Sequence, residues 1–279
     1  MSVLIFGAQG QVGRALKAHM PQAVALSRAD YDVAQADADS LAALLAAHAP
    51  HTIYNAAAYT QVDAAEKNRD TAFAVNAEFP ALLARWCAQH GVRLVHYSTD
   101  YVFDGLKETP YRITDIPRPP NLYGHSKLAG EHAILASGCA HVIIRTSWVF
   151  DGQGKNFFTT MRRLMLAQPM VQVVADQIGA PTFAGHLAQA TMALVARLEA
   201  SGIFHLSAQG STSWHGFACA IHAAMPHSVT QKIIPIVTEE YPLPARRPCN
   251  SLLDHSAAQV LGIILPHWTA GLKAAMADV

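Results

Sequence analysis

The sequence predicts an α/β protein in which a doubly wound parallel sheet is joined to a smaller C-terminal lobe. Two observations predict this fold. Short apolar runs that suit buried strands alternate along the chain with segments of helical periodicity. The chain has 279 residues, of which 51% are hydrophobic, so it can bury a sizeable core. Strands joined by helical crossovers run parallel and need helices on both faces of their sheet.

The first strand is expected in the apolar run at residues 3–6, before a glycine-rich turn and a helix-forming segment. The turn has the spacing Gly-x-x-Gly-x-x-Gly, formed by Gly7, Gly10 and Gly13. Gly7 permits a tight turn, Gly10 lets a pyrophosphate approach the backbone, and Gly13 lets the helix pack against the strand. Backbone N–H groups at the helix start then receive the phosphates. This pattern predicts a Rossmann-type dinucleotide site, the alternative being a glycine-rich connection without a ligand.

The residues that follow the second strand, at 23–26, are those that usually determine which cofactor a Rossmann-type fold binds. NAD-specific folds usually hold the ribose hydroxyls there with an acidic residue, whereas an arginine accommodates the 2′-phosphate of NADP. Here Ser27 and Arg28 follow the strand, and the first carboxylates come later, at Asp30 and Asp32. We therefore predict NADPH as the cofactor, with NADH possible. The alternative is that Arg28 is a solvated loop residue.

The rest of the chain continues the alternation of strands and helices. A third strand at residues 52–54 runs into Asn55 and three alanines, and a long helix is expected over residues 70–90, with a kink at Pro80. A further helix is expected at 157–166, and further strands at 141–145, 171–174 and 204–206. The expected organisation has a dinucleotide-binding core in residues 1–150, with part of residues 170–210 returning to it. Residues 151–279 are then mainly a substrate-binding lobe.

Tyr123 and Lys127 have the spacing Tyr-x-x-x-Lys, which places both side chains on one face of a helix. An adjacent ammonium favours the phenolate and lowers the tyrosine pKa from its ordinary value of about 10. The sequence therefore predicts Tyr123 as a proton donor to a carbonyl oxygen. Thr99 ends an apolar strand, where it can donate to the same oxygen, although a Ser-Thr pair there is also typical of a turn or helix cap.

Charge and cysteine content limit the possible partners. Lys plus Arg equals Asp plus Glu, at 20 each, which argues against binding to nucleic acid or a membrane surface. The four cysteines are widely spaced, as expected of a reducing cytoplasm, and the histidines lack metal-ligand spacing. No apolar run reaches the roughly 18 residues of a membrane span, and the N-terminal run is too short for a signal peptide.

Several segments together resemble the extended short-chain dehydrogenase/reductase family. The general ones are residues 10–13, 55–58, 98–103, 123–131 and 145–150. Two later segments, residues 176–182 and 245–251, are similar to a narrower group that reduces dTDP-linked 4-keto-6-deoxy sugars. The resemblance implies hydride transfer from NADPH to the 4-keto group of dTDP-4-dehydro-6-deoxy-L-mannose, which gives dTDP-L-rhamnose.

The resemblance also implies roles for single residues. The cofactor pyrophosphate would contact Gly10, Gln11 and Val12, and the cofactor groove would be lined by Ala57, Ala58 and Tyr59. Thr99 and Asp100 would face the sugar, Trp148 would pack on it, and Tyr123 with Lys127 would carry out the chemistry. Arg246 and Arg247 are suited to bidentate contact with the diphosphate, the alternative being a basic surface turn.

The sequence also bears on metal content, on oligomeric state and on alternative functions. Members of the family are described as forming a magnesium-linked dimer through glutamates, but this chain has Ala15 and Gly185 near those positions. We therefore predict no metal, and either a monomer or a homodimer. The alternatives for function are a reductase or epimerase of another nucleotide sugar, and a non-catalytic dinucleotide-binding regulatory subunit.

Overall fold

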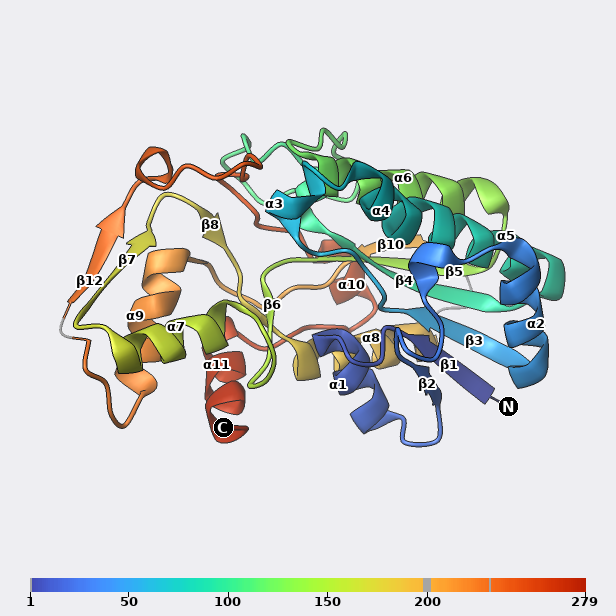
Figure 1. Cartoon of the computed structure of the whole chain (residues 1–279), viewed down its shortest axis with the longest axis horizontal. Coiled ribbons are helices and arrows are strands. Elements are labelled where there is room, and N and C mark those ends of the chain that lie inside the picture. The colour runs from blue at the N-terminus through green and yellow to red at the C-terminus, as the bar shows by residue number, and fades with distance from the viewer. Residues whose placement is uncertain (1, 198–201, 231) are drawn as a thin grey trace.

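The computed structural model describes residues 2–197, 202–230 and 232–279. A six-stranded parallel sheet lies at its centre, in the order β2-β1-β3-β4-β5-β10 (Figure 1). Its strands are β1 (Ser2–Phe6), β2 (Val24–Leu26), β3 (Pro50–Asn55), β4 (Arg93–Thr99), β5 (His141–Thr146) and β10 (Gly202–His205). From β1 the chain builds the sheet first toward β2 and then, from β3 onward, in the opposite direction. The sheet is therefore doubly wound, as predicted, with its switch point between β1 and β3.

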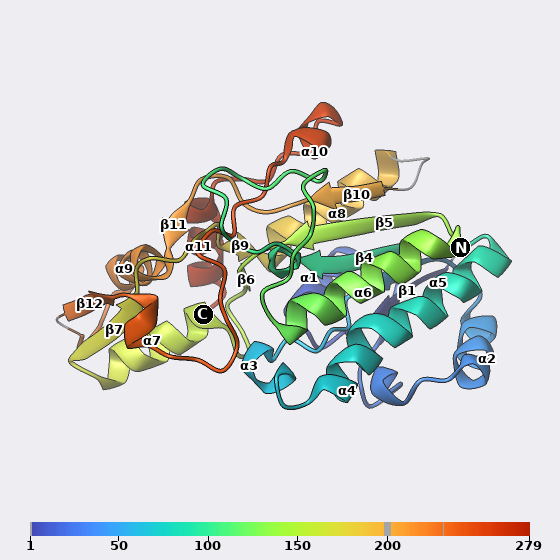
Figure 2. The ribbon, with the colours of Figure 1, turned by 90° about the horizontal axis from the view of Figure 1, so that it is seen from above.

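Helices cover both faces of the sheet (Figure 2). One face carries α1 (Gln11–His19) and α8 (Ala184–Arg197), and the other carries α2 (Ala38–His48), α5 (Phe79–His90) and α6 (Leu122–Ser137). Strand β1 shows how the sequence fits this arrangement. Leu4 and Phe6 pack into the α2–α5 core, whereas Ile5 packs into the α1–α8 core. Successive residues of a strand point to opposite faces, so a continuous apolar run is what a strand buried on both sides requires.

The helix expected over residues 70–90 is continuous but irregular. It consists of α4 (Arg69–Phe73), a π-helical turn (Ala74–Glu78) and α5, after the short helix α3 (Val62–Ala65). Pro80 is the second residue of α5, so its missing N–H falls where the π-helical turn already interrupts the regular hydrogen-bond pattern of the helix. The irregularity thus lies before Pro80, and the π-turn buries Asn76 completely.

Beyond β5 the chain builds a third apolar core, beside the sheet (Figure 1). It is formed by α7 (Phe157–Ala167), β7 (Met170–Val174), α9 (Trp214–Ala224), β12 (Lys232–Ile236) and α11 (Trp268–Ala277). The strand predicted at 171–174 pairs with β12 rather than with the central sheet, whereas β10 joins that sheet beside β5. The remaining short elements are β6 (Val149–Phe150), β8 (Ile178–Gly179), β9 (Thr182–Phe183), β11 (Thr212–Ser213) and α10 (Ser256–Val260).

None of the helices in the described ranges is both long and apolar enough to cross a membrane.

Candidate active site

The turn after β1 has the geometry that its glycines predict. Gly7 has a φ of +78°, and a Cβ added there would lie 2.6 Å from the backbone nitrogen of Ala57. A Cβ at Gly13 would collide with the Gly7 carbonyl, so only glycine lets α1 approach this closely. Gly10, in contrast, is crowded only by the Gly7 carbonyl and lines a cavity. The start of α1 therefore offers free backbone N–H groups beside open space.

This cavity, of about 560 Å³, opens at the carboxyl ends of the parallel strands. Its wall includes residues that follow β1, β3, β4 and β5, together with parts of α6 and of the chain beyond β6. Of the residues singled out in the sequence, it is lined by Gly10, Gln11, Val12, Ala58, Thr99, Asp100, Tyr123, Lys127 and Trp148. Segments that are far apart in the sequence thus meet where ligands bind in sheets of this type.

Thr99 and Tyr123 come together at this cavity. Thr99 ends β4 and is buried, and its hydroxyl donates to Asp100 Oδ1 at 3.0 Å. Tyr123 stands in the first turn of α6, which begins at the N-cap Asn121. The Asn121 side chain accepts a hydrogen bond from the Gly124 N–H at 2.9 Å and so fixes the turn that carries the phenol.

Lys127 lies one turn after Tyr123, as predicted, but its ammonium nitrogen does not bond the phenol. Nζ donates to the Tyr97 carbonyl at 2.6 Å and lies 3.2 Å from His96 Nε2. Burial raises the pKa of Tyr123 above its ordinary value, the Thr99 hydroxyl opposes this, and the charge of Asp100 adds to it. Lys127 is not among the groups that shift the pKa of Tyr123 here, and burial sets its direction, so the lowering of the pKa expected from Lys127 is not seen in this structure.

Two buried carboxylates stand near these groups. Burial raises the pKa of Asp100 to about 6, against hydrogen bonds from Ser251 and Thr99 that favour its charged form. Behind the cavity, Glu131 is paired with Arg145 at 2.6 Å and accepts from the Ser98 hydroxyl at 2.5 Å. This pair fixes the end of β4 against α6 and β5, so the positions of Thr99 and Tyr123 are held by the core.

The other predicted cofactor residues lie outside the lining of this cavity. Ser27 donates through its backbone N–H and hydroxyl to Asp30 Oδ2, at 2.8 and 2.7 Å. The Arg28 guanidinium, whose side chain is 79% exposed, pairs with Asp32 at 3.1 Å. After β3, the Ala57 N–H donates to Asn55 Oδ1, and the Tyr59 N–H donates to Asn76 Oδ1 at 2.9 Å.

The apolar wall of the cavity is a pair of stacked tryptophans rather than Trp148 alone. The Trp148 and Trp214 rings are 3.5 Å apart between centroids and nearly parallel, at 8°. The backbone of Gly179 lies against the Trp148 indole, since a Cβ added at Gly179 would lie 2.7 Å from Trp148 Cζ2. The free face that the sequence predicted for Trp148 is thus partly covered. Trp214 was not predicted, since only its position after Ser213, the N-cap of α9, marks it locally.

Arg246 and Arg247 do not line this cavity, and their roles differ. Arg247 Nη2 is paired with Asp63 Oδ2 at 2.7 Å, and the Ala245 N–H donates to the other oxygen of the same carboxylate. Arg247 is thus already engaged in an ion pair, and its predicted contact with the diphosphate stays a prediction. Arg246 is exposed, and its carbonyl accepts from the Asn121 side chain. Lys155, which was not predicted, adds an exposed ammonium to the cavity lining.

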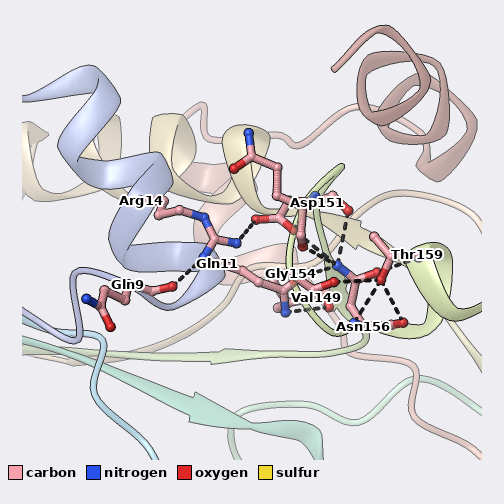
Figure 3. A network of polar contacts seen from close by, with 9 residues as sticks. Gln9, Gln11, Arg14, Val149, Asp151, Gly154, Asn156 and Thr159 are labelled. Atoms are coloured by element: carbon pink, nitrogen blue, oxygen red, sulfur yellow. Dashed lines mark hydrogen bonds and ion pairs between the residues drawn. The ribbon is translucent and has the colours of Figure 1, made fainter. Parts of the chain in front are cut away.

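A polar network ties the glycine-rich turn to the loop before α7 (Figure 3). Arg14 of α1 pairs with Asp151 at 2.6 Å and donates to the Gln9 carbonyl. Asn156, the N-cap of α7, donates to Gln11 Oε1 at 2.9 Å. The two sides of the cavity are therefore joined directly, although they are about half the chain apart in the sequence.

A parallel sheet with a glycine-rich turn after its first strand, and with Thr99, Tyr123 and Lys127 at its carboxyl edge, defines the class of short-chain dehydrogenases and reductases.

Comparison with known proteins identifies the particular family. Residues 1–279 match the family described as the RmlD substrate binding domain, and the chain belongs to this family. A dTDP-4-dehydrorhamnose reductase of Burkholderia thailandensis is 43% identical, over 100% of this chain and 99% of that protein. The enzyme of the same name from Escherichia coli is 36% identical, over 98% of this chain and 96% of that protein.

Solved structures agree with these relatives. The dTDP-4-dehydrorhamnose reductase of Bacillus anthracis, crystallised in complex with NADP, has a TM-score of 0.92 and 34% identity, and the match covers 100% of this chain and 99% of that one. The ortholog from Clostridium acetobutylicum has a TM-score of 0.95 and 32% identity, with the same coverage. A UDP-glucose 4-epimerase of Thermus thermophilus, at 19% identity and a TM-score of 0.83, shares the fold.

Proposed function

We propose that the protein reduces the 4-keto group of dTDP-4-dehydro-6-deoxy-L-mannose to dTDP-L-rhamnose, with NADPH as the hydride source. One observation carries this proposal. The hydroxyl groups of Thr99 and Tyr123 meet in the same cavity that the glycine-rich turn opens. The relatives named above are dTDP-4-dehydrorhamnose reductases, which favours this function over another nucleotide-sugar enzyme or a regulatory subunit.

The residues present fit a dinucleotide. Gly10 leaves open space at the uncapped start of α1, so the backbone at Gly10, Gln11 and Val12 can hold the pyrophosphate. Ala57, Ala58 and Tyr59 follow β3 beside that turn and form the groove of the cofactor. Ser27 and Arg28, which follow β2, would receive the 2′-phosphate in this proposal. When bound, NADPH supplies the hydride to the carbonyl carbon.

Tyr123 and Thr99 act on the carbonyl oxygen of the sugar. When the sugar is bound, the Thr99 hydroxyl turns from Asp100 to this oxygen, so that both hydroxyls donate to it and stabilise the negative charge that develops as the carbon is reduced. Tyr123 then gives its proton to the oxygen. The raised pKa of Tyr123 keeps the phenol protonated before the reaction. It still makes an effective donor, because an alkoxide is a stronger base than a phenolate.

The remaining residues hold the substrate in place. Asp100 stands beside Thr99 and faces the sugar, and the Trp148–Trp214 stack forms an apolar wall for it. Arg246 binds the diphosphate, whereas Arg247 positions the loop of Arg246 by holding Asp63. Residues 1–150, with the segment that returns through β10, form the cofactor core in this proposal, and the lobe from residue 151 onward completes the substrate site.

The protein is further proposed to act in the cytoplasm. No disulfide joins the cysteines within the described residues, and Cys249 is exposed, which suits a reducing compartment.

A coupled assay tests the function directly. Freshly generated dTDP-4-dehydrorhamnose is mixed with the protein and NADPH, and the loss of NADPH absorbance is followed. We expect turnover, with dTDP-L-rhamnose identified as the product by NMR. NADPH oxidation that yields the 4-epimer would assign the protein to another reductase, and binding of NADPH without turnover would favour a regulatory subunit.

A further inference from the structure

A chain of buried polar side chains leads from β3 to Lys127. Asn55 and His96 are register partners on the neighbouring strands β3 and β4. Asn55 Nδ2 lies 3.1 Å from His96 Nδ1, and His96 Nε2 lies 3.2 Å from Lys127 Nζ. Asn55 and His96 are 0% exposed and Lys127 is 1% exposed, so water does not replace these contacts. The chemistry proposed above uses neither Asn55 nor His96.

The orientation of the Asn55 side-chain amide follows from its hydrogen bond with the backbone N–H of Ala57. The Ala57 N–H lies 3.2 Å from Asn55 Oδ1, and a backbone N–H can only donate. Oδ1 therefore faces Ala57, and the NH₂ group of Asn55 faces His96. That NH₂ group also only donates, so His96 Nδ1 must accept. A neutral imidazole accepts at one nitrogen and donates at the other, which places the ring hydrogen on Nε2, facing Lys127.

We propose that Asn55 and His96 are positioning residues that set the charge of Lys127, because the Nε2–H of His96 points at its nitrogen. An ammonium has three donors and no lone pair, so it cannot accept this hydrogen bond, whereas an amine can. The second contact of Nζ, donation to the Tyr97 carbonyl, is available to both forms. The chain from Ala57 to His96 therefore favours the amine form of Lys127.

The groups around Lys127 leave this effect in place. Glu131, one turn later on α6, favours the ammonium, but it is paired with Arg145 of β5 and bonded by Ser98 of β4. Tyr123, one turn earlier on α6, stays protonated, and Asp100 at the cavity acts on Tyr123. His96 is neutral, because burial and Lys127 lower its pKa well below the ordinary value. The pKa of Lys127 itself is lowered to about 8, chiefly by burial.

This inference has a kinetic consequence that rests on the proposed function. If turnover requires Lys127 in its ammonium form, kcat/KM should fall as pH rises through about 8, where Lys127 loses its proton. We call this decline of kcat/KM at high pH the falling limb. A change that reverses the donor and acceptor of the Asn55–His96 hydrogen bond should move the falling limb to higher pH.

Asn55→Asp is the sharpest test, because it keeps the shape of the side chain and removes its donor. A carboxylate only accepts, so His96 must turn Nδ1–H toward it and present a bare Nε2 to Lys127. We expect nitrogen NMR to find the His96 hydrogen on Nε2 in the parent protein and on Nδ1 in the variant. The pH at which kcat/KM declines should increase by about one unit, since the ammonium of Lys127 gains an acceptor.

A second variant and a control keep the test decisive if Asn55→Asp does not fold. Asn55→Ala removes the group that dictates the tautomer and should move the falling limb in the same direction by less. His51→Asn removes an exposed histidine from the same strand and should leave the limb unchanged. A parent His96 with its hydrogen on Nδ1, or folded Asn55 variants with an unmoved limb, would overturn the inference. The NMR result does not need turnover, so it stands apart from a failure of the proposed function.

Discussion

The carboxyl edge of the central sheet and the wall built by the C-terminal part of the chain form one cavity by different means. At the edge, each functional group comes from a short motif, such as the glycine turn or the pair Tyr123 and Lys127. In the wall, Trp214 and Lys155 gain a role only through contacts between distant segments. We infer that the edge determines the chemistry and the wall determines which sugar is held. Variants of the reacting groups at the edge should therefore change kcat, and variants of the wall should change KM for the sugar.

Tyr123→Phe should have the largest effect. It removes the proton donor while leaving the ring that packs edge-on against Tyr101, at 5.6 Å between centroids. General acid catalysis contributes roughly 10²- to 10⁴-fold, so kcat should fall by about that factor. The loss of NADPH absorbance measures turnover, and a binding titration should give an unchanged Kd for NADPH. A variant with near-normal turnover would exclude Tyr123 as the donor.

Arg246→Ala should come next, and it should act on binding. A hydrogen bond between charged groups contributes about 1.5 kcal/mol or more, which corresponds to a rise in KM of roughly tenfold. Initial rates at varied nucleotide-sugar concentration measure it. Arg85→Ala, an exposed arginine of α5, is the matched control and should leave KM unchanged.

Arg247→Ala sharpens the same comparison, because its guanidinium is already paired with Asp63. The pair is partly exposed, so its loss should cost under about 1 kcal/mol of stability and raise KM less than Arg246→Ala does. A larger rise in KM for Arg247→Ala than for Arg246→Ala would reverse the two roles.

The same division explains how much the sequence could predict. The glycine turn, the strand that ends at Thr99 and the helix of Tyr123 follow from local spacing, and the structure contains all three. The direction of the pKa of Tyr123 could not be predicted, because it depends on burial by segments far along the chain. The pairing of Arg247 with Asp63 and the stacking of Trp214 on Trp148 join residues that no local pattern relates.

Trp214→Ala tests whether the tryptophan stack acts as a unit. Aromatic pairs contribute about 0.5–1.5 kcal/mol beyond their buried area, so KM for the nucleotide sugar should rise roughly two- to tenfold with little change in kcat. The double variant with Trp148→Ala should cost less than the sum of the single variants, because the two rings are in contact. Trp86→Ala, which breaks a stack with His90 on α5, is the control. Additive effects on KM would show that the rings act separately.

Asp30→Asn should give the smallest effect, and it acts at the cofactor end of the edge. Asp30 accepts from the backbone N–H and hydroxyl of Ser27, and these bonds lower its pKa, so it is ionised at neutral pH. Its carboxylate thus takes the donors that a 2′-phosphate would use and repels that phosphate. Removing the charge should tighten NADPH binding by roughly threefold, while NADH, which lacks the phosphate, should bind no better.

Fluorescence titration of both cofactors measures this selectivity without any turnover. Asp39→Asn is the matched control, because it removes the same charge from an exposed position at the start of α2. If both variants tighten NADPH equally, the cause is the overall charge of this surface, which acts at long range. If only Asp30→Asn does so, the contact with Ser27 is the cause. The preference for NADPH over NADH would then depend on competition between Asp30 and the 2′-phosphate for the donors of Ser27. The sequence positions of Ser27 and Arg28 alone do not reveal this competition.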